Sequence, residues 1–338
     1  MRRWPAVLAV LALITFGAVL QSPPAQAKGG EVGGSGNEYY LSDSFSAQAN
    51  IAFAYGSAGD RTYVGDWNGD GVDTLALRRG NIYHIRNSLS GGAADRQVAY
   101  GRTSDVVLVG DWNGDGIDTL VVRRGNIYYF RNSLSSGNAD RVVAYGRTSD
   151  VVLVGDWNGD GIDTLAVRRG NIYYFINSLS SGNADRVVAY GRTSDRVLIG
   201  DWNGDRVDSL AVRRDNLYYI ANGFGGGAAD RVVAYGRATD AVMVGDWNAD
   251  GIDTLGIRRP APAPVQFGAG TLRVGTDVAP GTYRASTGAD SCYWERLAGF
   301  SGEFDDIIAN DFDGSLVVTI AASDAGFSSV GCGRWTRL

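Results

Sequence analysis

The feature that most constrains the fold of this chain is a nine-residue motif, Gly-Asp-Trp-Asn-Gly-Asp-Gly-Val-Asp, which begins at Gly65. Related copies begin at Gly110, Gly155, Gly200 and Gly245, each 45 residues after the one before. A strict period of this length is typical of one supersecondary unit copied in tandem, in which each unit packs against its neighbours. We therefore expect a ring or a stack of equal units rather than a fold built around one unique site.

Each repeat contains four short apolar runs separated by Gly, Asn, Asp and Ser. In the third copy these runs are Val151–Val154, Leu165–Val167, Ile172–Phe175 and Val187–Tyr190. Valine, isoleucine and tyrosine favour strands and the separating residues favour turns, so four strands and four turns account for the period. The runs are apolar at successive positions, which indicates sheets covered on both faces. Each repeat is thus predicted to form one four-stranded sheet.

The two ends of the repeat array decide between a closed ring and an open stack. The last repeat stops at Arg259 after two strands, and the segment Asn37–Val64 supplies the two missing strands before the first motif. An open solenoid does not need complementary ends and requires polar caps, whereas a closed propeller joins its ends to remove free sheet edges. We therefore predict an all-β chain in which residues 37–259 form a five-bladed β-propeller closed by N-terminal strands.

The chain before the repeats falls into two short segments. Residues 1–27 combine two arginines, an apolar run and Ala25-Gln26-Ala27, which predicts a cleaved signal peptide. An uncleaved anchor helix is the alternative, but the apolar run is short for a membrane span. Residues 28–36 are rich in glycine and are expected to form a flexible lead-in. A phosphate-binding loop is excluded there, because neither Lys-Ser/Thr nor a helical pattern follows.

The period disappears after a Pro/Ala linker at residues 260–265. Residues 266–338 contain further strand-like runs, such as Tyr293–Leu297, and are predicted to form a small β domain with a thin core. Cys292 and Cys332 are the only cysteines of the chain. Because two thiols in one exported module most often pair, we predict a disulfide bond that closes this domain.

The repeated motif places oxygen-bearing side chains at alternate positions of one short loop. In the first copy these are Asp66, Asn68 and Asp70, followed after a glycine by the Val72 carbonyl and Asp73. Oxygen ligands at this spacing, without His or Cys, favour Ca²⁺. The alternative is a turn whose carboxylates accept backbone N–H bonds. The predicted calcium ligands in the other four loops are Asp111, Asn113, Asp115, Ile117 and Asp118; Asp156, Asn158, Asp160, Ile162 and Asp163; Asp201, Asn203, Asp205 and Asp208; and Asp246, Asn248, Asp250, Ile252 and Asp253.

The fourth copy of the loop differs from the others at one position. Arg206 stands where the other copies have the turn glycine. A non-glycine residue strains a turn with positive φ, and the guanidinium group could neutralise the loop carboxylates in place of a metal ion. Calcium binding by this copy is therefore left open.

The motif Gly-Asp-Trp-Asn-Gly-Asp-Gly-x-Asp-Thr, followed by a short apolar strand, resembles the FG-GAP/VCBS repeat. The resemblance covers residues 37–259 and implies an integrin-α-type propeller with calcium in its Asp-rich loops, as in adhesive bacterial surface proteins. The closing Asp of that family stands three residues after the glycine, whereas here it stands two residues after it. The C-terminal sequence, with Cys-Tyr-Trp-Glu-Arg-Leu and Gly-Cys-Gly-Arg-Trp, is similar to a module common in secreted actinobacterial proteins, for which no activity is implied.

The residue inventory argues against several function classes. The net charge of −6 is unlike that of a general nucleic-acid binder. His84 is the only histidine and occupies a position that is tyrosine in other copies, so a Ser–His or Cys–His pair has no base. A carboxylate-pair polysaccharide hydrolase remains an alternative, but it needs two acids in unlike environments, and near-identical repeats oppose this. We therefore expect no enzymatic activity.

Repeated surface residues favour recognition instead. Each unit offers an arginine pair, an Asn-x-Tyr-Tyr strand and a tryptophan, which are groups that bind sugars and acidic glycans, and repetition adds avidity. Trp67 and its equivalents are interpreted as wedges between blades, and one arginine of each pair is expected to bridge to a loop Asp. The candidate ligand-binding residues are Arg79, Arg124, Arg169, Arg214, Tyr129, Tyr174 and Tyr219.

Together these observations predict a secreted, monomeric, calcium-binding protein for recognition or adhesion. Its expected partner is an extracellular glycan or a surface protein, without nucleic acid and without a membrane span after signal cleavage. A calcium-stiffened scaffold that presents the C-terminal module is the alternative.

Overall fold

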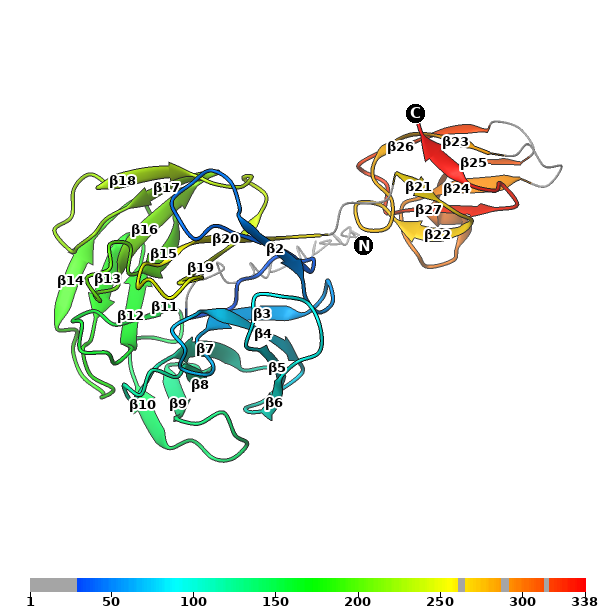
Figure 1. Cartoon of the computed structure of the whole chain (residues 1–338). Coiled ribbons are helices and arrows are strands. Elements are labelled where there is room, and N and C mark those ends of the chain that lie inside the picture. Colours follow the sequence, from blue (N-terminus) through cyan, green and yellow to red (C-terminus); the bar gives the residue numbers. More distant parts are fainter. Residues whose placement is uncertain (1–28, 261–264, 287–291, 313–315) are drawn as a thin grey trace, which may run out of the picture.

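The computed structural model of the chain describes residues 29–260, 265–286, 292–312 and 316–338, and it is almost entirely β-structure. A larger body formed by the repeats and a smaller C-terminal body are visible in Figure 1. The predicted signal peptide and residues 261–264 of the predicted linker lie outside the described residues. Within the described ranges, no helix is long and apolar enough to cross a membrane.

The repeats fold into five antiparallel four-stranded sheets, which we number 1 to 5. Sheet 1 contains β3 (Arg61–Gly65), β4 (Thr74–Arg79), β5 (Ile82–Arg86) and β6 (Arg96–Ala99). Sheet 2 contains β7 (Val106–Gly110), β8 (Thr119–Arg124), β9 (Ile127–Arg131) and β10 (Arg141–Ala144). Sheet 3 contains β11 (Val151–Gly155), β12 (Thr164–Arg169), β13 (Ile172–Phe175) and β14 (Arg186–Ala189). Sheet 4 contains β15 (Arg196–Gly200), β16 (Ser209–Arg214), β17 (Leu217–Ile220) and β18 (Arg231–Ala234).

Sheet 5 joins the two ends of the repeat array. It consists of β19 (Ala241–Gly245), β20 (Thr254–Arg259), β1 (Glu38–Leu41) and β2 (Ile51–Ala54). β1 pairs with β20 in a register that sets Tyr40 opposite Ile257, so the N-terminal strands complete the last repeat as predicted. The first strands of the sheets contact one another in turn, and β19 also contacts β3. The sheets are therefore arranged like the blades of a propeller around these strands.

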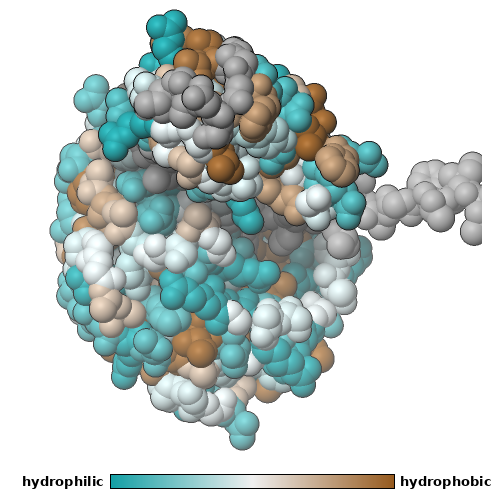
Figure 2. All heavy atoms as spheres, turned by 90° about the vertical axis from the view of Figure 1, so that its right-hand side faces the viewer, coloured by the Kyte–Doolittle hydropathy of each residue, from teal (hydrophilic) through white to brown (hydrophobic). Residues whose placement is uncertain are grey.

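Neighbouring sheets bury the apolar residues of the first two strands on both faces. Tyr63 and Trp67 of sheet 1, for example, pack in one cluster with Val109 and Leu120 of sheet 2. The five motif tryptophans are only 2–3% exposed, so their interpretation as wedges between sheets is correct. The fourth strands are more open, and Val142 on β10 is 56% exposed. On the face seen in Figure 2, the hydrophobic residues are scattered among hydrophilic ones.

The glycine-rich segment at residues 29–36 differs from the flexible lead-in that we expected. Val32 is completely buried in it, and the Val109 amide donates a 3.0 Å hydrogen bond to the Gly29 carbonyl. Gly29 has a φ of +72°, and a Cβ atom there would lie 2.5 Å from Cβ of Val154. The segment thus packs against the first strands of the sheets, where its small residues fit and larger ones would clash.

The C-terminal body is a sandwich of two further four-stranded sheets. One sheet contains β21 (Gln266–Phe267), β28 (Trp335–Arg337), β23 (Gly281–Ala285) and β26 (Val317–Ile320). The other contains β22 (Gly270–Arg273), β27 (Gly326–Val330), β24 (Tyr293–Leu297) and β25 (Ile307–Phe312), and a short 3₁₀ helix, η1 (Phe304–Asp306), precedes β25. Tyr283, Phe327 and Trp335 are completely buried between the two sheets.

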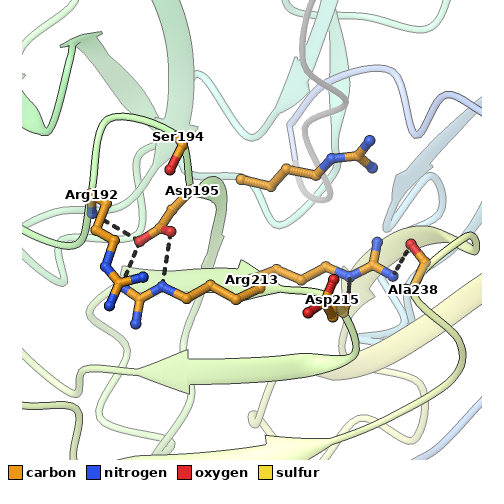
Figure 3. Close-up of a pocket in the computed structure, with 8 residues that line it drawn as sticks. Arg192, Ser194, Asp195, Arg213, Asp215 and Ala238 are labelled. Atoms are coloured by element: carbon orange, nitrogen blue, oxygen red, sulfur yellow. Dashed lines mark hydrogen bonds and ion pairs between the residues drawn. The ribbon is translucent and has the colours of Figure 1, made fainter.

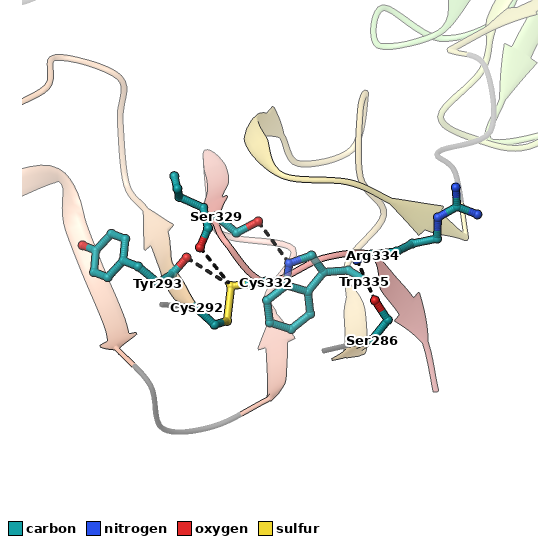
Figure 4. The surroundings of a disulfide bond; sticks show 8 residues. Ser286, Cys292, Tyr293, Ser329, Cys332, Arg334 and Trp335 are labelled. Atoms are coloured by element: carbon teal, nitrogen blue, oxygen red, sulfur yellow. Dashed lines mark hydrogen bonds between the residues drawn. A yellow bond between two sulfur atoms is a disulfide. The ribbon is translucent and has the colours of Figure 1, made fainter. Parts of the chain in front are cut away.

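The predicted disulfide bond joins Cys292 to Cys332 (Figure 4). It connects the start of β24 to the turn that precedes β28. Beside it, the indole N–H of the buried Trp335 donates a 3.0 Å hydrogen bond to the Ser329 hydroxyl. The disulfide therefore joins the start of β24 to the turn between β27 and β28, beside a completely buried tryptophan of the core.

Candidate functional site

The first aspartate of each acidic loop closes the loop by accepting backbone N–H bonds. In the first loop, Asp66 Oδ1 accepts the amides of Asn68, Gly69 and Asp70 at 3.2, 2.7 and 3.3 Å. Asp66 Oδ2 accepts the Gly71 amide at 2.7 Å. Both carboxylate oxygens thus bind donors of their own loop, which is the turn geometry that the sequence left as the alternative to calcium.

The second aspartate of the loop also accepts hydrogen bonds from its own loop. Asp70 Oδ2 accepts the Asn68 side-chain amide at 2.8 Å, and Asp70 Oδ1 accepts the Val72 amide at 2.9 Å. The equivalent amide-to-carboxylate bonds of the other four loops measure 2.8, 2.9, 2.9 and 3.0 Å. The repeated sequence therefore gives the same local structure five times.

The last aspartate of each loop reaches the neighbouring sheet instead of its own loop. Asp118 Oδ2 accepts the Asp66 amide at 2.8 Å, and the Asp118 amide donates to the Asp66 carbonyl at 2.7 Å. The same pair of bonds joins Asp73 to Asp246 and closes the series between the first and last loops. These aspartates link all five loops into a continuous ring.

The predicted calcium ligands therefore gather at one end of the ring, but they do not form separate cages. A cavity of about 270 Å³ is lined there by Asp73, Asp111, Asp156, Asp163, Asp201, Asp208, Asp246 and Asp253. Within the described residues, no group of three or more His, Cys, Asp or Glu side chains is arranged to hold a metal ion. As these residues lie here, the Asp66 oxygens accept N–H bonds, so a calcium ion would have to replace these bonds in order to bind. The calcium prediction is therefore still untested.

Arg206 keeps the loop geometry in the fourth copy despite replacing glycine. Its φ is 69°, in the left-handed region, and its amide donates a 2.7 Å hydrogen bond to Asp201 Oδ2. The Gly71 amide makes the same bond in the first loop. The substitution thus leaves the backbone unchanged and places a guanidinium group at the edge of the acidic cavity.

The first arginine of each pair fastens one sheet to the next. Arg78 is 2% exposed, and its guanidinium donates to the Asp105 carbonyl at 2.9 Å and to the Arg102 carbonyl at 2.7 Å. These carbonyls belong to the turn that leads into β7, so the contact joins sheets 1 and 2. Arg168 and Arg213 make the equivalent contacts in the third and fourth repeats.

The second arginine of each pair, which we predicted as a ligand-binding residue in the first four pairs, is held in an ion pair. Arg124 donates through Nε and Nη2 to the Asp105 carboxylate at 2.8 and 2.6 Å. Its guanidinium carbon lies 4.7 Å from the centre of the Tyr129 ring. The expected bridge to an Asp is present, but the aspartate lies in the turn before the first strand. Equivalent ion pairs join Arg79 to Asp60, Arg169 to Asp150, Arg214 to Asp195 and Arg259 to Asp240.

These ion pairs shift the titration of their carboxyl groups. Hydrogen bonds from Arg214, opposed by burial and supported by the Arg192 amide, hold the pKa of Asp195 below its ordinary value. Burial by itself raises the pKa of Asp105, but the hydrogen bonds from Arg124 and from the backbone outweigh it, so this pKa is also lowered. Both carboxylates are thus ionised and structural at neutral pH.

Two equivalent cavities lie beside the arginine–tyrosine stacks of sheets 2 and 3. The first has a volume of about 500 Å³ and is lined by Tyr100, Arg102, Arg124, Tyr129, Asn138 and Val142, among others. The second has a volume of about 490 Å³ and is lined by Tyr145, Arg147, Arg169, Tyr174, Asn183 and Val187, among others. Each residue of the second set stands 45 positions after its equivalent in the first.

The structure thus brings the predicted pairs Arg124–Tyr129 and Arg169–Tyr174 each into one cavity. The asparagines and the exposed valines of these cavities are not among the predicted ligand-binding residues. The valines could have been found, because Val142 and Val187 occupy outward positions of short edge strands. Arg79 lies in its ion pair with 50% of its side chain exposed, and Arg214 lines a different cavity.

Comparison with known proteins gives one family match. Residues 265–336 match the family model of the Rv1352-like extracellular domain. No curated protein matches the sequence. A chain from the crystal structure of BBS1N in complex with ARL6DN, soaked with lead, is similar at 12% identity over 81% of this chain and 90% of that chain, with a TM-score of 0.32. A score this low carries no argument, and the FG-GAP/VCBS resemblance remains a prediction. The C-terminal module is similar to an extracellular domain, and the protein is extracellular.

Proposed function

We propose that this protein is a secreted, non-enzymatic recognition protein that binds an extracellular glycan in repeated cavities between the blades of a closed five-bladed β-propeller. The observation that carries this proposal is the pair of equivalent cavities in consecutive repeats, each lined by tyrosine, arginine, asparagine and valine. A repeated site suits a ligand that itself repeats, because several weak contacts then act together.

The closed ring is supported by bonds that recur between neighbouring sheets. The Tyr100 hydroxyl donates to the Tyr129 carbonyl at 3.0 Å, and the Tyr235 hydroxyl donates to the Tyr40 carbonyl at 2.9 Å. The second bond joins sheet 4 to the N-terminal strand of sheet 5, so it is equivalent to the first one. Equal bonds at the seam and within the array are what a closed propeller requires.

The chemistry of each cavity suits a sugar. The exposed Val142 offers apolar surface for the C–H face of a pyranose, and Tyr129, whose ring is stacked on Arg124, lines the cavity beside it. Arg124 uses Nε and Nη2 for Asp105, so Nη1 lies outside that ion pair, and the exposed Asn138 adds both a donor and an acceptor. These groups bind hydroxyl or carboxylate oxygens of a saccharide without any acid–base chemistry.

The non-enzymatic part of the proposal is supported by the equivalence of the aspartates that pair with the repeated arginines. Asp60, Asp105, Asp150, Asp195 and Asp240 all have a lowered pKa, and each is paired with the equivalent arginine. A carboxylate-pair hydrolase needs one raised and one lowered pKa in the same site. Turnover of any polysaccharide by the purified protein would contradict this part.

A saccharide-binding assay on the secreted protein tests the proposal. After a ligand is found on a glycan array, we expect the variant Asn138→Ala/Asn183→Ala to lose about tenfold in affinity, because two cavities lose a polar contact together. The matched control is Asn132→Ala/Asn177→Ala, which alters exposed asparagines of the adjoining turns, and it should retain affinity. Thermal melts of both variants should match that of the unaltered protein, since none of these side chains is buried.

Two outcomes would contradict the proposal. One is the absence of binding to any saccharide, in which case a surface protein takes the place of the glycan as ligand. The other is an equal loss of affinity in the control variant, which would show that the cavities are not the site.

Calcium binding by the acidic loops remains a proposal of its own. Its support is the oxygen-only donor set of Asp66, Asn68 and Asp70. A bound ion has to displace the N–H bonds of Asp66, and Asp73 is held by the neighbouring loop, so we expect weak, millimolar sites. Melting curves in chelator and in about 10 mM CaCl₂ check this, and identical midpoints would remove calcium from the proposal.

A further inference from the structure

A cavity in the fourth repeat is unlike the two glycan cavities, because arginines dominate its lining (Figure 3). It has a volume of about 410 Å³, and its charged lining residues are Arg192, Arg196, Arg213, Arg214, Asp195 and Asp215. It lies where β15 begins and β16 turns into β17, together with the Ser194 hydroxyl and Ala238 of the next turn.

Two of these residues are departures from the repeat. Arg196 stands where the second and third repeats have Val106 and Val151. Asp215 stands where the first three repeats have a glycine, such as Gly170, and it adopts a φ of 56° that favours glycine. The fourth repeat therefore carries two charged residues that the common sheet geometry does not require.

The positive charges of this cavity are only partly neutralised. Arg214 is paired with Asp195 at 2.7 Å. Arg213 is 4% exposed and donates to carbonyl oxygens, at 2.8 Å to Asp240 and at 2.6 Å to Asp215, but it forms no ion pair within the described residues. Burial lowers the pKa of Arg213, and the like charge of Arg196 lowers it further.

Arg196 differs in this respect from the arginine at the same position of the first repeat. Arg61 has a carboxylate partner, Glu31, at 3.6 Å. Across the part of the chain that the structure describes, neither Arg192 nor Arg196 forms a direct ion pair, and Asp215 does not pair with Arg196. The charge of Arg192 acts on Asp195, whose pKa it helps to lower, and Asp195 is already paired with Arg214. Like charges that share one cavity repel each other unless an anion screens them.

We propose that this cavity binds the oxyanion group of an acidic ligand, a carboxylate, sulfate or phosphate, with Arg196 and Arg192 as the charged donors and Ser194 as a neutral one. Guanidinium groups offer paired N–H donors that match the geometry of such oxyanions. Arg213, held by its bonds to the Asp215 and Asp240 carbonyls, adds positive potential to the same cavity. The site is separate from the glycan cavities, so either proposal can fail without the other.

The experiment is a calorimetric titration of the secreted protein at constant ionic strength. The three probes, titrated separately, are inorganic sulfate, inorganic phosphate and oligogalacturonate. We expect Arg196→Val to weaken binding about fivefold, as an exposed ion contact does, with an unchanged melt because valine occupies this position in two other repeats. Asp215→Gly should strengthen binding, since it removes a negative charge and restores the glycine of the first three repeats.

The matched control is Arg61→Val, which makes the same change at the same position of the first repeat, and it should leave the affinity unchanged. Which of the three probes binds distinguishes an acidic saccharide from a free inorganic anion. The proposal is overturned if none of the probes binds, or if Arg61→Val and Arg196→Val weaken binding equally, since that result indicates only a change in overall charge.

Discussion

The turn position of the acidic loops shows how one backbone angle selects a residue. Gly71, Gly116, Gly161 and Gly251 occupy it with φ values between 81° and 84°, and Arg206 occupies it at 69°. A side chain with a Cβ atom is strained in this region, whereas glycine is not. The amide at this position is committed to the first aspartate of the loop in every copy, so the backbone cannot relax to another angle.

We expect Arg206→Gly to raise the free energy of unfolding by about 0.5–1 kcal/mol, because the left-handed strain is released while the bond to Asp201 is kept. Chemical denaturation measures the change. The reciprocal variant, Gly161→Arg in the third loop, should lower stability by a similar amount. An unchanged or lower stability of Arg206→Gly would show that the guanidinium group stabilises the acidic cavity by more than the strain costs.

The aspartate–arginine pairs predict a specific dependence of stability on acid. The folded pKa of Asp105 lies below its ordinary value, so its contribution is fully present above about pH 4 and is lost as the pH falls through the folded pKa. The pKa values of the equivalent aspartates Asp60, Asp150, Asp195 and Asp240 are also lowered. We therefore expect the melting temperature to fall steeply below about pH 4. Thermal melts between pH 2 and 7 test this, and a flat profile would contradict it.

The variant Asp105→Asn isolates one of these pairs. We expect it to lower the free energy of unfolding at neutral pH by about 2 kcal/mol, because the buried carboxylate bonds to Arg124 and to the Arg102 amide are lost. Asp140→Asn is the control, since the Asp140 side chain is 44% exposed and its pair with Arg131 should contribute less than about 1 kcal/mol. Equal losses in the two variants would show that burial of the pair does not matter.

Contacts between neighbouring sheets come from the turns and strand ends that flank each β-sheet. The Tyr145 hydroxyl donates to the Tyr174 carbonyl at 3.0 Å, and burial raises its pKa to about 12. Such a bond joins two sheets that are not otherwise hydrogen-bonded to each other through their strands. Each blade is therefore stabilised by its own ladder, and the ring is stabilised by apolar packing between sheets together with tyrosine, arginine and aspartate contacts.

We expect Tyr145→Phe to lower the free energy of unfolding by about 1 kcal/mol, because it removes one bond between sheets and keeps the packing of the ring. Tyr40→Phe serves as the control, since among the described residues its hydroxyl makes no hydrogen bond to a neighbouring sheet and its carbonyl, which accepts from Tyr235, is unchanged. Equilibrium denaturation of both variants provides the measurement, and equal stabilities would contradict the proposed role of the hydroxyl.

The two bodies of the protein have separate cores and are expected to unfold separately. The disulfide lies entirely in the smaller body and joins residues that are 40 positions apart. In the chain-entropy model a loop of this length contributes about 4 kcal/mol. Reduction of the disulfide should therefore lower the unfolding temperature of the C-terminal body only, and calorimetry with and without reductant measures this. A shift of both transitions would show that the two bodies are coupled.

The sequence accounts for most of the fold because its signals are local or periodic. The strand Tyr293–Leu297 and the four strands of each repeat follow from β-propensity and turn residues, and the missing strands of the last repeat identified Glu38–Leu41 as their replacement. The glycine-rich segment at residues 29–36 is an exception, because the sequence predicts a flexible lead-in and the structure shows a packed segment. Its composition suits a flexible chain, and only the close approach of Val109 and Val154 makes small residues necessary there.

The candidate site was accessible from the sequence only in part. The spacing of Asp66, Asn68 and Asp70 fixed a compact acidic loop, because these side chains can reach only the amides next to them. The hydrogen bond from the Asp66 amide to Asp118 and the ion pair of Arg124 with Asp105 depend on which turn lies within reach in the folded chain. The sequence by itself thus determined the strands, the closure of the ring and the disulfide, since these rest on period and composition. The tertiary structure alone decided the partners of the charged groups and the cavities, since these arise where neighbouring sheets meet.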